Sequence, residues 1–190
     1  MRGQASYYAR VTTANESRPF FLRSARLGFG TWSPEELDLA VALWGDLRVT
    51  RLIGGPFPED QIRDRLAGEI AMQRSAGFQY WPIFRLQDGA HVGCCGLRPD
   101  AAGAALELGV HLRFEHWGRG FASEAARAAI AHAFGPLGIR QLVAGHHPEN
   151  RASRRLLERL GFRYLSDTLY PPTGLHHPTY LLRRDDVDGF

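Results

Sequence analysis

The spacing of apolar residues is most regular between residues 122 and 134. Seven apolar side chains recur there every three or four positions, which is the spacing of one face of an α-helix. Five of the seven are alanine, so we expect this face to approach a sheet closely. The members of the stripe are Ala122, Ala125, Ala126, Ala129, Ile130, Ala133 and Phe134.

Three further helices are predicted from their boundaries. Ser33, Pro34 and Glu36 supply a capping residue, a proline for the first helical position and a carboxylate placed to close a capping box. A second helix is expected over residues 58–76, where Gly77 ends it. The last helix is expected over residues 150–160, before Gly161.

Strands are predicted where β-branched and aromatic residues lie between turn signals. The ranges are 20–27, 79–86, 91–97, 104–112, 141–146, 162–168 and 178–184. Asp88 and Gly89 form a strong hairpin turn, and Pro82 indicates an edge strand or a bulge. Hairpins together with a strand–helix–strand crossover predict an α/β (α+β) fold, with a mixed, mostly antiparallel sheet of about seven strands and about four helices.

The length of 190 residues suits one domain. Residues 1–18 are polar and lack the apolar core of a signal peptide, so we expect a loose leader followed by a single domain over residues 19–190. No run approaches the roughly 20 apolar residues that a membrane helix needs. Cys94 and Cys95 are neighbours that point in opposite directions on a strand, and we interpret them as small buried residues in a reducing compartment. These features predict a cytoplasmic protein with no membrane partner.

The charges are spread along the chain. There are 23 Lys and Arg residues against 20 Asp and Glu residues, for a net charge of +3, and no basic run that would suit nucleic acid. The histidine pairs at residues 146–147 and 176–177 lack a third ligand at suitable spacing, so we expect no metal.

A short loop before the alanine-rich helix carries the main candidate chemistry. Gly118 and Gly120 let the backbone approach a ligand, and the start of a helix offers unpaired N–H groups and partial positive charge to a phosphate. Arg119 adds a cation. A lone G-x-G is more often an ordinary tight turn, and both a P-loop and a complete dinucleotide-binding G-x-G-x-x-G are missing.

Two longer sequence motifs accompany this loop, one that contains it and one that follows it. LRFEHWGRGFASEA at residues 112–125 resembles motif A of the GNAT acetyltransferases, in the form of the RimJ/RimL-like (ribosomal-protein alanine N-acetyltransferase) branch. NRASRRLLERLGF at residues 150–162 is similar to the N-x-x-S…LGF element of that branch, and the resemblance covers residues 20–184. The family loop has Gln or Arg, two residues, Gly, one residue, and Gly or Ala. Gly120 and Ala122 fit that pattern, whereas Trp117 departs from it.

The resemblance implies acetyl-CoA as co-substrate. Backbone N–H groups from Gly118 to Ser123 would receive the pyrophosphate of coenzyme A, and the pantetheine arm would pair with Val110 and Leu112. The main-chain N–H near Val110 or His111 would then stabilise the oxyanion. The implied cofactor-binding residues are Val110, His111, Leu112, Trp117, Gly118, Arg119, Gly120, Phe121, Ala122, Ser123, Asn150 and Ser153. Asn150 is also interpreted as a helix N-cap.

Direct attack by an amine needs a base for the ammonium and an acid for the leaving thiolate, but no nucleophilic Cys. Glu107 is the candidate base, because flanking leucines would desolvate it and raise its pKa. The alternative is a structural glutamate paired with an arginine. His111 is a second candidate base. Ser153 is the candidate acid or thiol contact, and its alternative is a solvated helix serine.

The resemblance thus predicts acetyl transfer to a primary amine, on a protein N-terminus or a small molecule, within a ternary complex of a monomer or homodimer. Phe78, Tyr80, Trp81 and Tyr170 are candidates either for an acceptor pocket or for the core. The alternative function is a non-catalytic sensor domain of the same fold that binds acyl-CoA without turnover.

Overall fold

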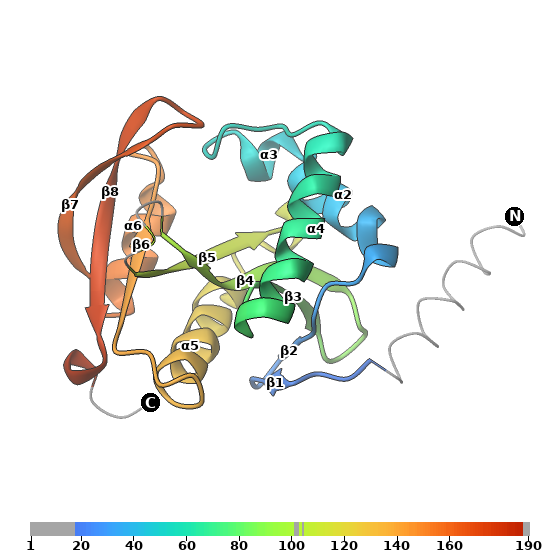
Figure 1. Ribbon diagram of the computed structural model, residues 1–190, viewed down its shortest axis with the longest axis horizontal. Helices are drawn as coiled ribbons and strands as arrows, with labels where there is room; N and C mark the ends of the chain where they lie inside the picture. The colour runs from blue at the N-terminus through green and yellow to red at the C-terminus, as the bar shows by residue number, and fades with distance from the viewer. Residues whose placement is uncertain (1–17, 101–102, 104, 188–190) are drawn as a thin grey trace, which may run out of the picture.

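The computed structural model describes residues 18–100, 103 and 105–187 (Figure 1). Within them, one eight-stranded sheet is flanked by five α-helices. The strands are β1 (Leu22–Arg23), β2 (Leu27–Phe29), β3 (Tyr80–Arg85), β4 (His91–Pro99), β5 (Leu106–Leu112), β6 (Gln141–Gly145), β7 (Arg163–Tyr170) and β8 (Leu175–Arg183). The helices are α2 (Leu37–Trp44), α3 (Leu47–Thr50), α4 (Glu59–Ala76), α5 (Phe121–Phe134) and α6 (Arg151–Arg159). Apart from Arg18, the expected leader lies outside the described residues.

The order of strands across the sheet is β1-β2-β3-β4-β5-β6-β8-β7. Only β5 and β6 are parallel, and α5 is the crossover between them. The other neighbours are antiparallel, including the predicted meander of β3, β4 and β5. The prediction of a mixed, mostly antiparallel α/β fold is confirmed.

The N-terminal part of the sheet differs from the prediction. The single strand expected over residues 20–27 is a hairpin of β1 and β2 that turns at residues 24–26. The turn contains no Gly, Pro, Asn or Asp, and Ser24 is its single turn-favouring residue, so the sequence signal for a turn is weak. The short helix α3 was also not predicted.

Pro82 does not mark an edge strand, because β3 pairs with β2 on one side and with β4 on the other. The pairing with β2 ends at Ile83, one residue from the proline. The carbonyl of Pro82 then accepts the N–H of Gly30 over 3.0 Å. The missing N–H of the proline therefore falls where β2 has already ended. The register shift predicted by the bulge alternative lies next to it, between Ile83 and Phe84.

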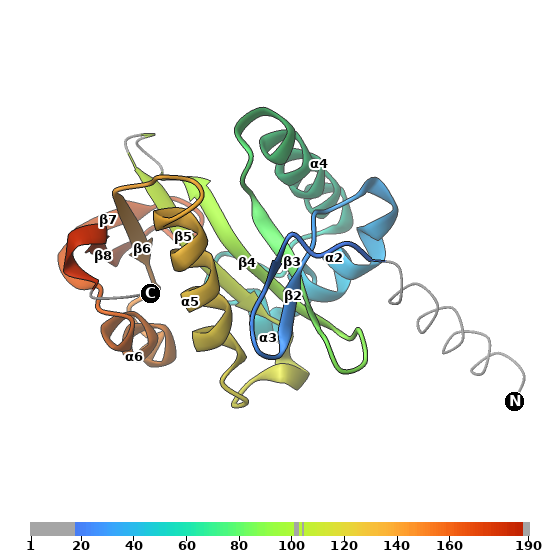
Figure 2. The same cartoon turned by 90° about the horizontal axis from the view of Figure 1, so that it is seen from below.

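The two faces of the sheet carry separate cores. Helices α5 and α6 lie on one face, and α2 and α4 lie on the other (Figure 2). The alanine stripe of α5 is buried against β4 and β5, except Ala122, which is half-buried. The small side chains let the helix axis approach the strands, as predicted. No helix in the described ranges combines the length and apolar character needed to cross a membrane.

Both predicted helix boundaries near residues 33 and 77 are observed. Pro34–Glu36 forms a short 3-10 turn that leads into α2, and the carboxylate of Glu36 accepts the N–H of Ser33 over 2.9 Å. Helix α4 ends at Gly77, whose φ of 79° lies in the left-handed region.

Candidate active site

The loop between β5 and α5 holds two glycines in a left-handed conformation. Gly118 has φ of 72° and Gly120 has φ of 78°. Gly120 is the N-cap of α5, so the first N–H groups of that helix have no partner one turn earlier. Both glycines are exposed, and no atom lies within 4 Å of the place that a Cβ would occupy at Gly118. The loop therefore presents backbone N–H groups at an open surface, a geometry that suits a phosphate.

The turn between β1 and β2 is fastened to this loop. The carboxylate of Glu124, in the first turn of α5, accepts hydrogen bonds from Oγ of Ser24 at 2.7 Å, from the N–H of Arg26 at 2.7 Å and from Nε of Arg26 at 2.6 Å. Nη1 of Arg26 donates to the carbonyl of Arg119 over 3.1 Å, and the guanidinium lies 4.5 Å from the centroid of Phe121. Arg26 is therefore part of the site, although the sequence carried no local signal for it.

An open hollow of about 700 Å³ lies beside the same loop. Three arginines contribute to its lining, which consists of Arg23, Ser24, Ala25, Arg26, Gly120, Ser123, Glu124, Arg127 and Ala128. The guanidinium groups outnumber the single carboxylate, so the hollow suits an anionic ligand.

Trp117, the departure from the family pattern, has a structural contact. Its indole N–H donates to the carbonyl of Leu112 over 2.8 Å, and its ring centroid lies 5.2 Å from that of Phe114. Trp117 therefore fixes the path of the chain from the end of β5 into the glycine loop.

Strands β5 and β6 separate just before this loop. They pair only at Leu106 with Leu142 and at Glu107 with Val143. The N–H of Arg113 donates to the carbonyl of Val92 over 2.9 Å, one position beyond the paired residues Leu112 and Gly93. Because successive N–H groups of a strand point in opposite directions, the odd-numbered residues of β5 direct theirs toward β4. The N–H groups of Val110 and Leu112 consequently face the splayed edge, whereas that of His111 faces β4. An extended ligand can pair with this edge.

Glu107 lies where the two strands begin to separate. Burial raises the pKa of its carboxyl, against smaller opposing effects of Arg98 and of a hydrogen bond from the backbone of Gly145. Arg98 is its cross-strand partner in the β4–β5 register. Glu107 nevertheless forms no ion pair within 4.0 Å in the described part of the chain, and Arg98 lies nearest Glu69, with Nε 3.7 Å from its Oε1. The structure thus leaves the Glu107 carboxylate without the salt bridge that a purely structural role would use.

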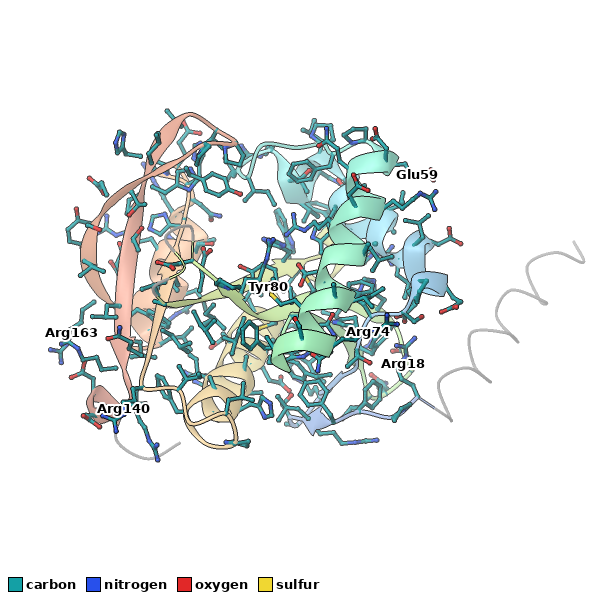
Figure 3. All side chains as sticks on the ribbon, in the orientation of Figure 1. Arg18, Glu59, Arg74, Tyr80, Arg140 and Arg163 are labelled. Carbon is teal, nitrogen blue, oxygen red and sulfur yellow. The ribbon has the colours of Figure 1, made fainter. Side chains whose placement is uncertain are left out.

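Alternate residues of β5 point away from α5. We call Glu107, Gly109 and His111 the open face of β5, because all three remain partly exposed in a central strand. A Cβ at Gly109 would lie 2.4 Å from the hydroxyl oxygen of Tyr80, so this tyrosine rests directly on the β5 backbone. In Figure 3, Tyr80 lies near the middle of the molecule, between β5 and α4.

His111 is held by neighbours on this face. The indole N–H of Trp44 donates to its Nδ1 over 3.3 Å, and the Tyr80 ring centroid lies 5.6 Å from that of His111. Burial, followed by the charges of Arg65 and Arg98, lowers the pKa of His111 to about 3. A base with so low a pKa retains little affinity for a substrate proton near neutral pH.

Asn150 is the N-cap of α6, as one interpretation of the sequence predicted. Its Oδ1 accepts the N–H of Ser153 over 3.0 Å, which orients the first turn of the helix. Both side chains are half-buried.

The candidate aromatic residues do not form one group. Trp81 is fully buried in the core beneath α5 and donates its indole N–H to Gln73, and Phe78 packs against that same core. Tyr80 belongs to the opposite core with Trp44. Tyr170 stacks on His177 with ring centroids 4.6 Å apart. Trp81 and Tyr80 are thus buried in the two cores, whereas Phe78 and Tyr170 are half-buried.

The histidine pairs are engaged with other groups. Nδ1 of His146 lies 2.8 Å from the carbonyl of His147, and the hydroxyl of Thr173 lies 2.9 Å from Nε2 of His177. Across the described residues, no cluster of three or more His, Cys, Asp or Glu side chains is suited to a metal ion. Cys94 and Cys95 are buried free thiols, as predicted.

The amino-acid sequence is similar to those of known and uncharacterized acetyltransferases. Residues 26–163 match the family described as Acetyltransferase (GNAT) domain. The chain is 30% identical over 147 residues to the uncharacterized N-acetyltransferase p20 of Bacillus licheniformis, over 75% of this chain and 82% of p20. It is 39% identical over 145 residues to the uncharacterized N-acetyltransferase YoaA of Bacillus subtilis, over 75% of this chain and 82% of YoaA.

The fold is shared with solved acetyltransferases. The structure of RimL, an alpha-N-protein acetyltransferase of a ribosomal protein, in complex with coenzyme A superimposes with a TM-score of 0.72 at 16% identity, covering 89% of this chain and all of RimL. The match to the family model spans well over half of the chain. This chain therefore belongs to the GNAT family of N-acetyltransferases.

Proposed function

We propose that this protein transfers an acetyl group from acetyl-CoA to a primary amine, by direct attack in a ternary complex. The main support for the proposal is that three features follow one another along β5 and the loop after it. The carboxylate of Glu107 lies where β5 and β6 part, the free backbone edge of Val110 and Leu112 follows, and the glycine loop completes the path.

In the proposed complex, the loop from Gly118 to Ser123 receives the diphosphate of coenzyme A. Backbone N–H groups and the helix dipole supply the attraction, so the family's side chain at position 117 is not essential. Trp117 contributes instead by holding the carbonyl of Leu112. Arg119 stays exposed and available to a phosphate oxygen.

The pantetheine arm then pairs with the edge of β5 at Val110 and Leu112, like an added strand. The N–H of Val110 is our candidate donor to the thioester oxygen, because the N–H of His111 faces β4. Asn150 uses its Oδ1 as a helix cap, which leaves its amide N–H₂ group for pantetheine.

Glu107 takes the proton of the incoming ammonium, directly or through one water. A pKa raised by burial brings the carboxylate closer to the range in which a general base works. The amine attacks the carbonyl carbon and the carbon–sulfur bond breaks. The second proton of the attacking nitrogen passes to the leaving thiolate through the hydroxyl of Ser153, which gives one proton and takes up the other. The acceptor amine belongs either to a protein N-terminus or to a small molecule.

The test is release of free thiol from acetyl-CoA in the presence of a panel of primary amines. We expect turnover with at least one amine, and we expect Glu107→Gln to lower kcat by about 10²-fold or more while the Kd for coenzyme A stays unchanged. Gly120→Glu places a side chain and a negative charge on the loop, so it should abolish coenzyme A binding while circular dichroism stays native. Binding of coenzyme A without turnover of any amine would instead favour an acyl-CoA sensor.

A further inference from the structure

Arg65 of α4 forms no ion pair within 4.0 Å in the described part of the chain, although its charge also acts on the carboxyl of Glu69 one turn along the helix. Its guanidinium carbon lies 4.3 Å from the centroid of Trp44 and 6.0 Å from that of Phe57, so aromatic faces hold it in position. Its Nε is shielded from solvent and has no hydrogen-bond partner. By contrast, Arg63 on the same helix is exposed and pairs with Glu59 over 2.8 Å. A partly buried guanidinium with an unused donor has the features of a site for an anion.

The same guanidinium is linked to the open face of β5 through one aromatic ring, that of Trp44. The indole beneath Arg65 is the one that donates to His111. After burial, Arg65 is the main charge that lowers the pKa of His111, and it also acts on Tyr170 and Tyr80. Tyr170 is under the influence of Glu107 as well. Trp44 therefore links Arg65 of α4 to the face of β5 that also carries Glu107.

A second cation lies on this region but is already shared. The guanidinium carbon of Arg98 lies 5.2 Å from the centroid of Tyr80, and its Nε is 3.7 Å from the buried carboxylate of Glu69. Arg98 therefore lies within ion-pair distance of a carboxylate, whereas Arg65 has none that close in the described residues. Of the two, Arg65 is the better partner for an incoming anion.

We propose that Arg65 binds a carboxylate on the acetyl acceptor, so that the acceptor is an amine that also carries a negative charge near its nitrogen. This inference rests on the proposed function. Glu107 attracts the ammonium and Arg65 attracts the carboxylate, which matches the two charges of such a molecule. The planar fork of the guanidinium suits the two oxygens of a carboxylate. The carboxylate can belong to a free amino acid or to an acidic residue beside the N-terminus of a peptide.

The experiment measures binding of matched acceptors to the protein saturated with coenzyme A, by calorimetry. Each free amino acid is paired with its amide, and peptides with Asp at the second position are paired with the same peptides carrying Asn. We expect at least one carboxylate member to bind about tenfold or more tightly than its uncharged partner. Preference in the first set identifies a free amino acid, and preference in the second identifies an acidic peptide.

The variant Arg65→Gln should remove this preference while leaving the affinity for coenzyme A unchanged. Arg65→Lys, which keeps the charge, should retain part of the preference even if Arg65→Gln folds poorly. Arg63→Gln is the matched control, because it removes a cation from the exposed side of the same helix and should leave the preference intact. Equal binding of both members of every pair, or no binding of any, would overturn the inference. Failure of the wild-type protein to bind coenzyme A would instead count against the proposed function.

Discussion

The indole N–H of Trp44 donates a hydrogen bond to Nδ1 of His111 over 3.3 Å. An acceptor nitrogen at Nδ1 places the ring proton on Nε2 and keeps the imidazole neutral. The helix α2 that carries Trp44 therefore determines the state of a side chain on the proposed catalytic strand.

We predict that His111 does not titrate between about pH 5 and about pH 8, because burial lowers its pKa to about 3. Long-range ¹H–¹⁵N correlation spectra should identify the Nε2–H tautomer across this interval. Trp44→Phe removes the donor and should change the Nδ1 chemical shift. A titration midpoint of His111 inside the interval would contradict the assignment.

The contact between Arg26 and Glu124 leads to a second prediction. Arg26→Ala removes the donor to the carbonyl of Arg119, so the phosphate-accepting loop loses its tie to the N-terminal hairpin. We expect the Kd for coenzyme A to rise about tenfold, the value of one charge-assisted hydrogen bond. Isothermal calorimetry measures this directly.

Arg163→Ala is the matched control, since Arg163 is an exposed cation at the far side of the molecule (Figure 3). It should leave the affinity within about twofold of the wild-type value, because charges farther apart than a Debye length are screened. An equal loss in both variants would mean that net charge alone explains the effect.

Two glycines give opposite predictions for stability. A Cβ at Gly109 would lie 2.2 Å from Cζ of Tyr80, so Gly109→Ala should displace the tyrosine and lower the free energy of unfolding by about 1–3 kcal/mol. Gly68 lies within α4 with nothing within 4 Å, so Gly68→Ala should raise it by about 0.5–1 kcal/mol. Urea unfolding followed by circular dichroism compares the two. A neutral effect of Gly109→Ala would show that Tyr80 moves freely.

Acid sensitivity is predicted at His91, which is 5% exposed between the rings of Trp32 and Phe84. Burial, with a smaller contribution from Arg113, lowers its pKa from 6.5 to about 3. Below about pH 6.5, the unfolded state therefore binds a proton at His91 that the folded state does not bind. The contribution of His91 to the free energy of unfolding is fully present above about pH 6.5 and is lost as the pH falls toward about 3.

At about pH 5, protonation of His91 in the unfolded state lowers the free energy of unfolding by about 2 kcal/mol. His91→Phe should remove that part of the pH dependence, as measured by urea unfolding at about pH 5 and about pH 7. The exposed His176 provides the control, because His176→Gln should keep the full dependence. An unchanged slope for His91→Phe would assign the acid sensitivity to other groups.

The sequence predicted those parts of the fold that have local causes. The alanine stripe of α5, the capping residues before α2 and the glycines after α4 and α6 each act within a few residues of one another. The hairpin of β1 and β2 was missed because Ser24 is the single turn-favouring residue in its turn. Pro82 indicated either an edge strand or a bulge, and the sequence could not choose between them because the point at which β2 ends is a tertiary property.

The candidate site was predicted in the same uneven way. The glycine loop and Glu107 lie inside one motif-bearing segment, so the sequence could indicate them. Arg26 lies 98 residues from Glu124, and Arg65 is linked to His111 of β5 only through the ring of Trp44 on α2. Contacts between distant segments have no periodic or spacing signal in a single sequence.

The central claim is that the backbone of the loop from Gly118 to Ser123 receives the diphosphate of coenzyme A. A crystal structure of the complex tests it most directly. The account predicts diphosphate oxygens about 3 Å from the loop nitrogens, with the pantetheine amides paired to Val110 and Leu112. Density for the diphosphate at any other place on the protein, with this loop free of contacts, would contradict it.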